Sequence, residues 1–222
     1  MCNNCLAILL SITSLGLFSV LQAEEYTSSY EKPSLKKSAS GVEVRANFLA
    51  SSGRFVQNFT ETDPNGHETQ TYSETSDLTT KGFSLLIGYG QDYKYRNQSS
   101  FLYIGYENQN WSDEYDSFYH GAIIGAEGAI GSRSLKLFYG GEFASGALDT
   151  GEEGLGYLYT FSAEPFIGLR VLPADGISIN IRVGVRGVYI EDVESMKGVN
   201  TLMSGNSAYT ANALIGLGYS FY

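Results

Sequence analysis

Apolar and polar residues alternate with a period of two along most of this chain. A clear case is GISINIRVGVRGVY at 176–189, where Ile177 and Ile179 share one face and Asn180 and Arg182 share the other. Successive side chains of a β-strand point to opposite faces. The pattern therefore predicts a strand with one oily face and one polar, charged face.

Eight segments follow this alternation, each of about 9–15 residues, and a tilted strand of about 9–11 residues spans a bilayer. None of them keeps a 3.6-residue period long enough for a core helix. The segments are 41–50, 82–90, 100–109, 118–130, 134–144, 157–171, 176–189 and 208–221. The chain is therefore expected to be all-β.

Two all-β architectures show such alternation: a soluble sandwich with its oily faces inward, and a membrane barrel with its oily face outward. Charge placement favours the barrel, because five acids and five bases all fall opposite the oily faces. Inside a narrow barrel such charges must pair, since an unpaired buried charge is costly. We expect them to form a structural ion-pair network in the lumen: Glu43, Arg45, Glu107, Glu127, Lys136, Glu142, Glu164, Arg170, Arg182 and Arg186.

The connections between the segments alternate in length, which is independent support for the barrel. Bacterial outer-membrane barrels have short periplasmic turns and longer extracellular loops. The predicted fold is an eight-stranded antiparallel up-and-down transmembrane β-barrel over residues 41–222. Eight strands leave an interior just wide enough for side chains to fill, so a packed barrel is favoured over a diffusion channel. The longer connections are 51–81, 110–117, 145–156 and 190–207, and the short ones are 91–99, 131–133 and 172–175.

The N-terminus has the pattern of an export signal. Residues 1–23 are uncharged and apolar from Leu6 to Leu21, and they end in Ala23 before an acidic pair. This matches a cleaved signal peptide. Residues 24–40 are polar and predict a periplasmic leader. Both cysteines lie in the first five residues, which excludes a disulfide framework or a cysteine-based metal site in the body.

The formal charge of −10 excludes a basic nucleic-acid footprint. Most of the net negative charge falls in the longer connections, so the extracellular end is expected to be acidic. Aromatic residues near the strand ends are expected to form membrane-interface girdles. On the loop side they are Trp111, Tyr157, Tyr189 and Tyr209, and on the turn side Tyr89, Tyr219 and Phe221.

The C-terminal segment YTANALIGLGYSFY has an apolar residue at every second position and ends in aromatics. It resembles the terminal strand of Gram-negative outer-membrane proteins. The chain as a whole resembles small eight-stranded barrels of the OmpA-barrel, OmpX and opacity-protein kind, in the porin-like superfamily. The resemblance implies insertion into the outer membrane by the barrel-assembly machinery, with Tyr219, Phe221 and Tyr222 as the assembly signal, and contact with outer-membrane lipid and lipopolysaccharide.

The sequence contains two histidines, His67 and His120. Some eight-stranded barrels modify lipid A with a Ser–His–acid group, and Ser117 lies close to His120. The two have opposite strand phase, however, so a histidine at the lipid headgroup zone is the preferred interpretation. We predict no catalytic residue, cofactor or metal. A structural, adhesive or recognition role is expected, with an unknown extracellular ligand or host surface; a lipid-A-modifying enzyme and a small channel are the alternatives.

The first long connection has its own strand pattern. Phe55, Gln57 and Phe59 continue the period-two alternation, and the returning side is rich in Thr, a good strand former. Asp63-Pro64-Asn65-Gly66 between them has the residue order of a type I turn. The sequence therefore predicts that the first two strands extend as a paired ribbon beyond the bilayer, turning at 63–66, and recognition is placed there.

Overall fold

A computed structural model of the chain describes residues 39–62, 68–93, 98–112, 117–132, 134–150, 156–192, 201–203 and 206–221. The predicted signal peptide lies outside these residues, as does all but the end of the leader. The first strand begins at Ala39, two residues before the expected start of the barrel.

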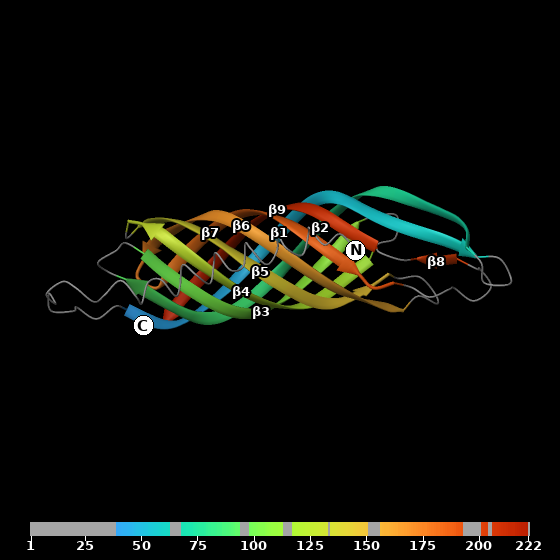
Figure 1. The fold of residues 1–222 in the computed structure, drawn as a ribbon. Coiled ribbons are helices and arrows are strands. Elements are labelled where there is room, and N and C mark those ends of the chain that lie inside the picture. The colour runs from blue at the N-terminus through green and yellow to red at the C-terminus, as the bar shows by residue number, and fades with distance from the viewer. Residues whose placement is uncertain are drawn as a thin grey trace, which may run out of the picture.

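The described residues form one closed sheet of antiparallel strands (Figure 1). Each long strand pairs with the next long strand along the chain, and β9 pairs with β1, so the ring closes. This confirms the predicted up-and-down barrel of eight long strands. The strands are β1 (Ala39–Thr62), β2 (Glu68–Tyr93), β3 (Gln98–Ser112), β4 (Ser117–Gly131), β5 (Leu135–Asp149), β6 (Tyr157–Ala174), β7 (Ile177–Ile190), a short β8 (Thr201–Met203) and β9 (Asn206–Phe221).

The register of the strands sets the tilt of the barrel. Following in-register partners once around the ring from Ala46 leads back to β1 at Val56, a stagger of ten residues. With a rise of about 3.4 Å per residue and about 4.8 Å between strands, this corresponds to a tilt of about 42°. Tilted strands need more residues to cross a membrane, which explains why most strands are longer than the alternation alone predicted.

The two faces of the sheet differ completely in chemistry. Large apolar side chains point outward on every long strand; Phe48 on β1 and Leu102 on β3 are 69% and 63% exposed. The ten charged residues of the predicted network and amides such as Asn47, Asn180 and Asn212 point inward and are buried, whereas Lys81, Asn108 and Asn110 near the loop end point outward. An oily exterior around a polar interior is the arrangement of a membrane barrel and the reverse of a soluble sandwich. In the part of the chain that the structure describes, no helix is long and apolar enough to cross a membrane.

The turn between β6 and β7 is a two-residue hairpin at Asp175-Gly176. Gly176 has a φ of 79°, a left-handed conformation that glycine adopts without strain. Its carbonyl accepts a hydrogen bond from the backbone N–H of Ser220 on β9 at 2.7 Å. The turn therefore also anchors the C-terminal strand at the short-turn end of the barrel.

The predicted ribbon is present. The β1–β2 pairing continues to Thr62 and Glu68, whereas β9 leaves β1 after Val56 and β3 leaves β2 after Thr79. Figure 1 shows β1 and β2 running together past the other long strands. The tip at 63–66 lies outside the described residues. The short strand β8 was not foreseen: it pairs with β1 opposite residues 59–61 and covers that edge of the ribbon.

Candidate functional site

The barrel lumen contains all ten of the charged residues that the alternation assigned to it. Each is at most 7% exposed. They come from six of the eight long strands, so the network ties the wall together across the lumen. The residues are Glu43, Arg45, Glu107, Glu127, Lys136, Glu142, Glu164, Arg170, Arg182 and Arg186.

One cluster of these charges lies toward the short-turn end and centres on Glu127. Arg45 donates to both oxygens of this carboxylate, at 2.7 and 2.9 Å, and donates from Nε to Glu43 at 2.6 Å. Arg170 also donates to Glu127, and its Nε donates to Asn180 at 2.7 Å. Glu127 thus joins β1, β4 and β6 through two guanidinium groups.

A second cluster lies toward the loop end. Arg182 donates to both oxygens of Glu142, at 2.8 and 2.6 Å, and lies 3.3 Å from Glu164. Arg186 donates to three carboxylates: Glu107 at 2.9 Å, Glu142 at 2.8 Å and Glu164 at 2.9 Å. Bidentate and shared guanidinium–carboxylate bonds of this kind are strong and fix geometry. This cluster connects β3, β5, β6 and β7.

Neutral groups add hydrogen bonds to the network, although Glu164 Oε1 and Arg182 Nε have no hydrogen-bond partner among the described residues. Lys136 donates from Nζ to Ser99 Oγ at 3.2 Å, and Tyr103 donates its hydroxyl to Glu142 at 3.0 Å. Such partners satisfy lone pairs that the guanidinium groups leave open, which buried charge requires. Most of the buried charge in the lumen is therefore paired within the protein.

Aromatic rings pack against the cations inside the lumen. The guanidinium of Arg45 lies 3.9 Å from the ring centre of Phe101, and that of Arg182 lies 4.4 Å from the ring centre of Phe166. These are cation–π distances. The sequence interpretation missed Phe166, although it shares the even phase of Glu164 on the same strand.

An apolar plug closes the lumen at the loop end, above the charged clusters. Every long strand contributes to it, and its buried members are almost inaccessible to solvent. The plug contains Phe55, Leu78, Trp111, Tyr119, Leu148, Leu158, Val188, Ile190 and Ala208. A ring of apolar side chains across an eight-stranded lumen interrupts the polar path through the described residues, which agrees with the preference for a packed barrel.

Trp111 corrects the predicted outer girdle. It was expected at the lipid interface, but it is 3% exposed, lies in the plug and donates its indole N–H to Gln109 at 3.2 Å. The alternation along β3 explains this position. Odd-numbered residues such as Glu107 point into the lumen there, and Trp111 is one of them. The other predicted girdle residues point outward: Tyr89, Tyr157, Tyr189, Tyr209, Tyr219 and Phe221.

The C-terminal aromatics lie at the short-turn end of β9. Tyr219 and Phe221 both point outward, and their rings meet edge to face with centroids 4.8 Å apart. Tyr222 lies outside the described residues. The role of these aromatics as an assembly signal stays a prediction.

His120 points out of the barrel near the loop end. Its Nδ1 lies 2.8 Å from the Tyr106 hydroxyl and 2.8 Å from Asn108 Nδ2. Ser117 is buried and faces the lumen, so the two lie on opposite faces of β4. They therefore form no nucleophile–base pair, which would need hydrogen-bond contact. Within the described residues, no group of three His, Cys, Asp or Glu side chains could hold a metal ion.

Comparison with known proteins gives matches only among solved structures. No family model matches the chain, and no curated protein does. It is similar to Neisserial surface protein A, with 15% identity, a TM-score of 0.45, and coverage of 84% of this chain and 100% of that one. It is also similar to Ail, the attachment invasion locus protein of Yersinia pestis, with 13% identity, a TM-score of 0.36, and coverage of 79% and 98%. A third match is the outer-membrane protease OmpT of Escherichia coli, with 8% identity, a TM-score of 0.38, and coverage of 85% and 99%.

The class of the protein follows from its own strand pairing and its two faces. The described residues form a closed ring of eight long antiparallel strands, oily outside and charged inside. Such a ring is a transmembrane β-barrel, and barrels of this construction belong to the outer membrane. The chain is accordingly an outer-membrane β-barrel protein of the small eight-stranded kind, as the sequence resemblance implied.

Proposed function

We propose that this barrel is a surface recognition protein that acts through its protruding β1–β2 ribbon and its acidic extracellular loops. The observation that carries this proposal is the ribbon itself. On β2, residues 68–78 extend beyond the last pair with β3. At ~3.4 Å per residue this segment is about 35 Å long. Leu78, at its base, belongs to the plug, but the residues beyond it extend past the last pairs with the neighbouring strands and take no part in the plug.

The ribbon is ordered by contacts of its own. Phe59 on β1 stacks on Tyr72 on β2 with ring centroids 5.1 Å apart, and Ser73 donates its hydroxyl to Asn58 at 2.6 Å. Aromatic and polar cross-strand pairs are the units that stabilise a two-stranded ribbon. The ribbon therefore offers a preformed surface to a partner.

The two edges of the ribbon differ. The β1 edge is covered by β8 at residues 59–61. The β2 edge at residues 68–78 has no strand partner among the described residues other than β1. An open edge accepts an extended chain by strand addition. The acidic side chains Glu68, Glu74 and Asp77 along it favour a basic partner.

Adhesion of a non-adherent Gram-negative strain that displays the protein tests this function. Deleting 56–74 should abolish binding to matrix-coated surfaces and cultured epithelial cells, with barrel display unchanged on gels. Neutralising Glu68, Glu74 and Asp77 should weaken binding, whereas neutralising Glu191 beside β7 should not. Unchanged adhesion of the deletion variant, displayed at normal levels, would contradict the proposal.

A further inference from the structure

The β1–β2 ribbon has two faces with different chemistry. Even-numbered residues of β2 between 70 and 78 share the phase of Leu78, which belongs to the plug, so they lie on the lumen-side face. The register between the two strands shifts only beyond Gln70, so this assignment holds from Leu78 up to that residue. On this face β2 contributes Gln70, Tyr72, Glu74 and Ser76, and Glu74 is the one charged residue of the four.

The two acidic residues of β2 in this stretch, Glu74 and Asp77, have different neighbours on β1. Asp77 is in register with Arg54 on the opposite, lipid-side face, whereas Glu74 is in register with the neutral Gln57. Directly opposite residues have their Cβ atoms only about 4.5–5.5 Å apart, so the charge of Arg54 balances that of Asp77. Both acidic side chains are exposed. The charge that this stretch offers to a partner is therefore that of Glu74, on the lumen-side face.

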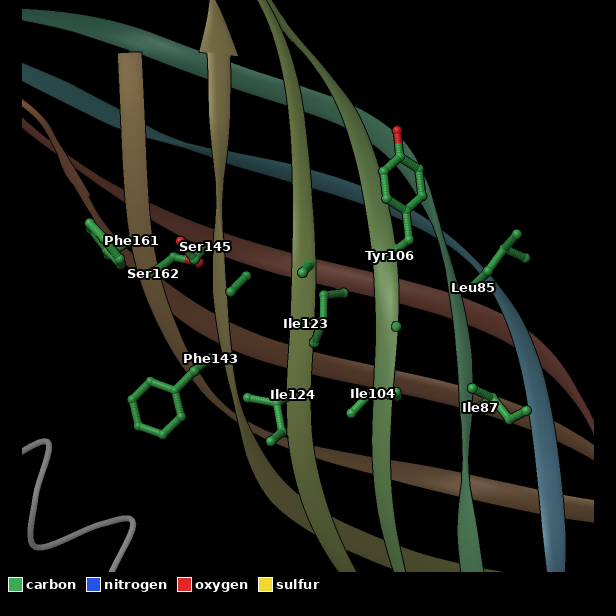
Figure 2. A pocket seen from close by; sticks show the side chains of 13 residues that line it. Leu85, Ile87, Ile104, Tyr106, Ile123, Ile124, Phe143, Ser145, Phe161 and Ser162 are labelled. Atoms are coloured by element: carbon green, nitrogen blue, oxygen red, sulfur yellow. The ribbon is translucent and has the colours of Figure 1, made fainter. Parts of the chain in front are cut away.

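The open edge of β2 continues the ladder that β3 forms in the barrel wall. In the wall β3 lies along β2, and Ile87 is beside Ile104 (Figure 2). β3 ends at Ser112, opposite Thr79, whereas β2 extends beyond that pair as part of the ribbon. A strand added along 70–78 would continue the line of β3. It would run antiparallel to β2, as β3 does, and antiparallel pairing is the slightly more stable kind.

The side chains of such a strand can be assigned to faces, because directly opposite residues of an antiparallel pair share a face. Opposite Glu74, a Lys or Arg would form an ion pair on the lumen-side face. Two positions later, opposite Tyr72, an aromatic or β-branched side chain would extend the stack that Tyr72 makes with Phe59, whose ring centre is 5.1 Å away. The positions between them lie opposite Ser73 and Thr71, where small polar residues fit.

We propose that the ribbon recognises an extended polypeptide segment in which a basic residue is followed, two positions later, by an aromatic or β-branched residue. The segment adds to the β2 edge at 70–78 and runs antiparallel to β2, with both of these side chains on the lumen-side face. On the lipid-side face, where Arg54 balances Asp77, a basic residue gains no such ion pair. This inference rests on the proposed recognition role of the ribbon and names the kind of polypeptide that it accepts.

Peptide binding to the whole chain in phosphatidylcholine nanodiscs tests this pattern, with fluorescence anisotropy as the readout. The probe is the labelled peptide VTKTYTQT, which is designed to place its Lys opposite Glu74 and its Tyr opposite Tyr72. The control peptide VTTKYTQT has the same composition, with the Lys moved by one position to the other face. The probe should bind saturably. The control peptide should bind about threefold more weakly, as expected for the loss of one exposed ion pair.

Two N-methylated forms of the probe test whether its backbone pairs with β2. Successive N–H groups of a strand point to opposite edges, so methylating alternate amides blocks one edge and leaves the other free. Strand addition predicts that one form loses binding and that the other binds as the unmethylated probe does. Equal binding of both forms would show that the peptide is not added as a strand, which would overturn the proposal.

A charge reversal in the chain tests the contact with Glu74. Glu74→Lys should weaken binding of the probe and strengthen binding of VTETYTQT, in which Glu replaces the Lys, so the preference between the two peptides should invert. The matched control is Glu191→Lys, an exposed position beside β7 and outside the ribbon, which should keep the preference of the unaltered protein. Heat-dependent migration on a denaturing gel shows whether each variant is folded.

Three results would each overturn the proposed pattern: no binding of the probe, equal binding of the probe and the control peptide, or an unchanged preference in Glu74→Lys. The adhesion assay separates these results from the proposed function. If deletion of 56–74 abolishes adhesion but the probe does not bind, recognition by the ribbon stands and the polypeptide pattern is wrong. If the probe binds as expected but the deletion leaves adhesion intact, the pattern is supported and the adhesive role is wrong.

Discussion

Removing Glu127 is the sharpest test of the lumen network. Its carboxylate accepts three N–H groups, two from Arg45 and one from Arg170, within a lumen where it is 5% exposed. Glu127→Ala leaves two guanidinium groups facing each other without their shared anion. Arg45 keeps Glu43 at 2.6 Å and Arg170 keeps Asn180 at 2.7 Å, so neither cation is stripped completely.

The expected loss follows from these contacts. Three hydrogen bonds to charged groups at about 1.5–3 kcal/mol each set an upper limit, and breaking a buried pair costs about 3–5 kcal/mol. Arg45 and Arg170 each keep one other partner, so the loss should match the cost of one broken buried pair and not the sum of three hydrogen bonds. The free energy of unfolding should therefore fall by about 3–5 kcal/mol. Urea unfolding in lipid vesicles can be followed through Trp111, the single tryptophan, which is buried in the plug.

Two controls make the result specific. Glu74→Ala removes an exposed carboxylate from the ribbon. This change should alter the free energy of unfolding by less than about 0.5 kcal/mol. The double variant Glu127→Gln, Arg170→Gln restores charge balance and should recover part of the loss through coupling between neighbours. If Glu127→Ala lowers the free energy of unfolding by less than about 1 kcal/mol, the cost is far below that of a broken buried pair. This result would refute the structural role of the network.

Four further outcomes are expected. The purified barrel should show no steady conductance in planar bilayers, because the apolar plug seals the lumen; stable single-channel openings would contradict this. Gly125→Leu should prevent folding, since any side chain there overlaps the Tyr103 ring, whereas Gly187→Ala, with its nearest atom 3.9 Å from the added carbon, should fold normally, as a refolding assay would show. Unheated and heated protein should migrate differently on a denaturing gel, as a closed barrel does; identical migration would argue against closure. The mature chain should begin near Glu24 and fractionate with the outer membrane, and N-terminal sequencing that starts at Met1 would disprove cleavage.

The alternation of side chains along each strand was enough to predict the class of fold. Successive side chains of an extended backbone point to opposite faces, and this is a local property. The sequence therefore shows which residues of a strand share a face, even when the neighbouring strands are unknown. The Thr-rich return after 63–66 is a local signal of the same kind. It predicted the ribbon correctly, because strand preferences act over a few residues. The connection predicted at 172–175 was misplaced: β6 continues to Ala174 and the turn is Asp175-Gly176.

Which residues meet across the lumen was decided by the tertiary structure alone. Arg45 and Glu127 are 82 positions apart, and they pair because the ten-residue stagger of the closed ring brings β1 and β4 to the same level. The same stagger brings Trp111 into the plug and places β8 beside β1. Alternation specifies the face of a residue, but its level and its partner depend on strand register, which closure of the whole ring determines.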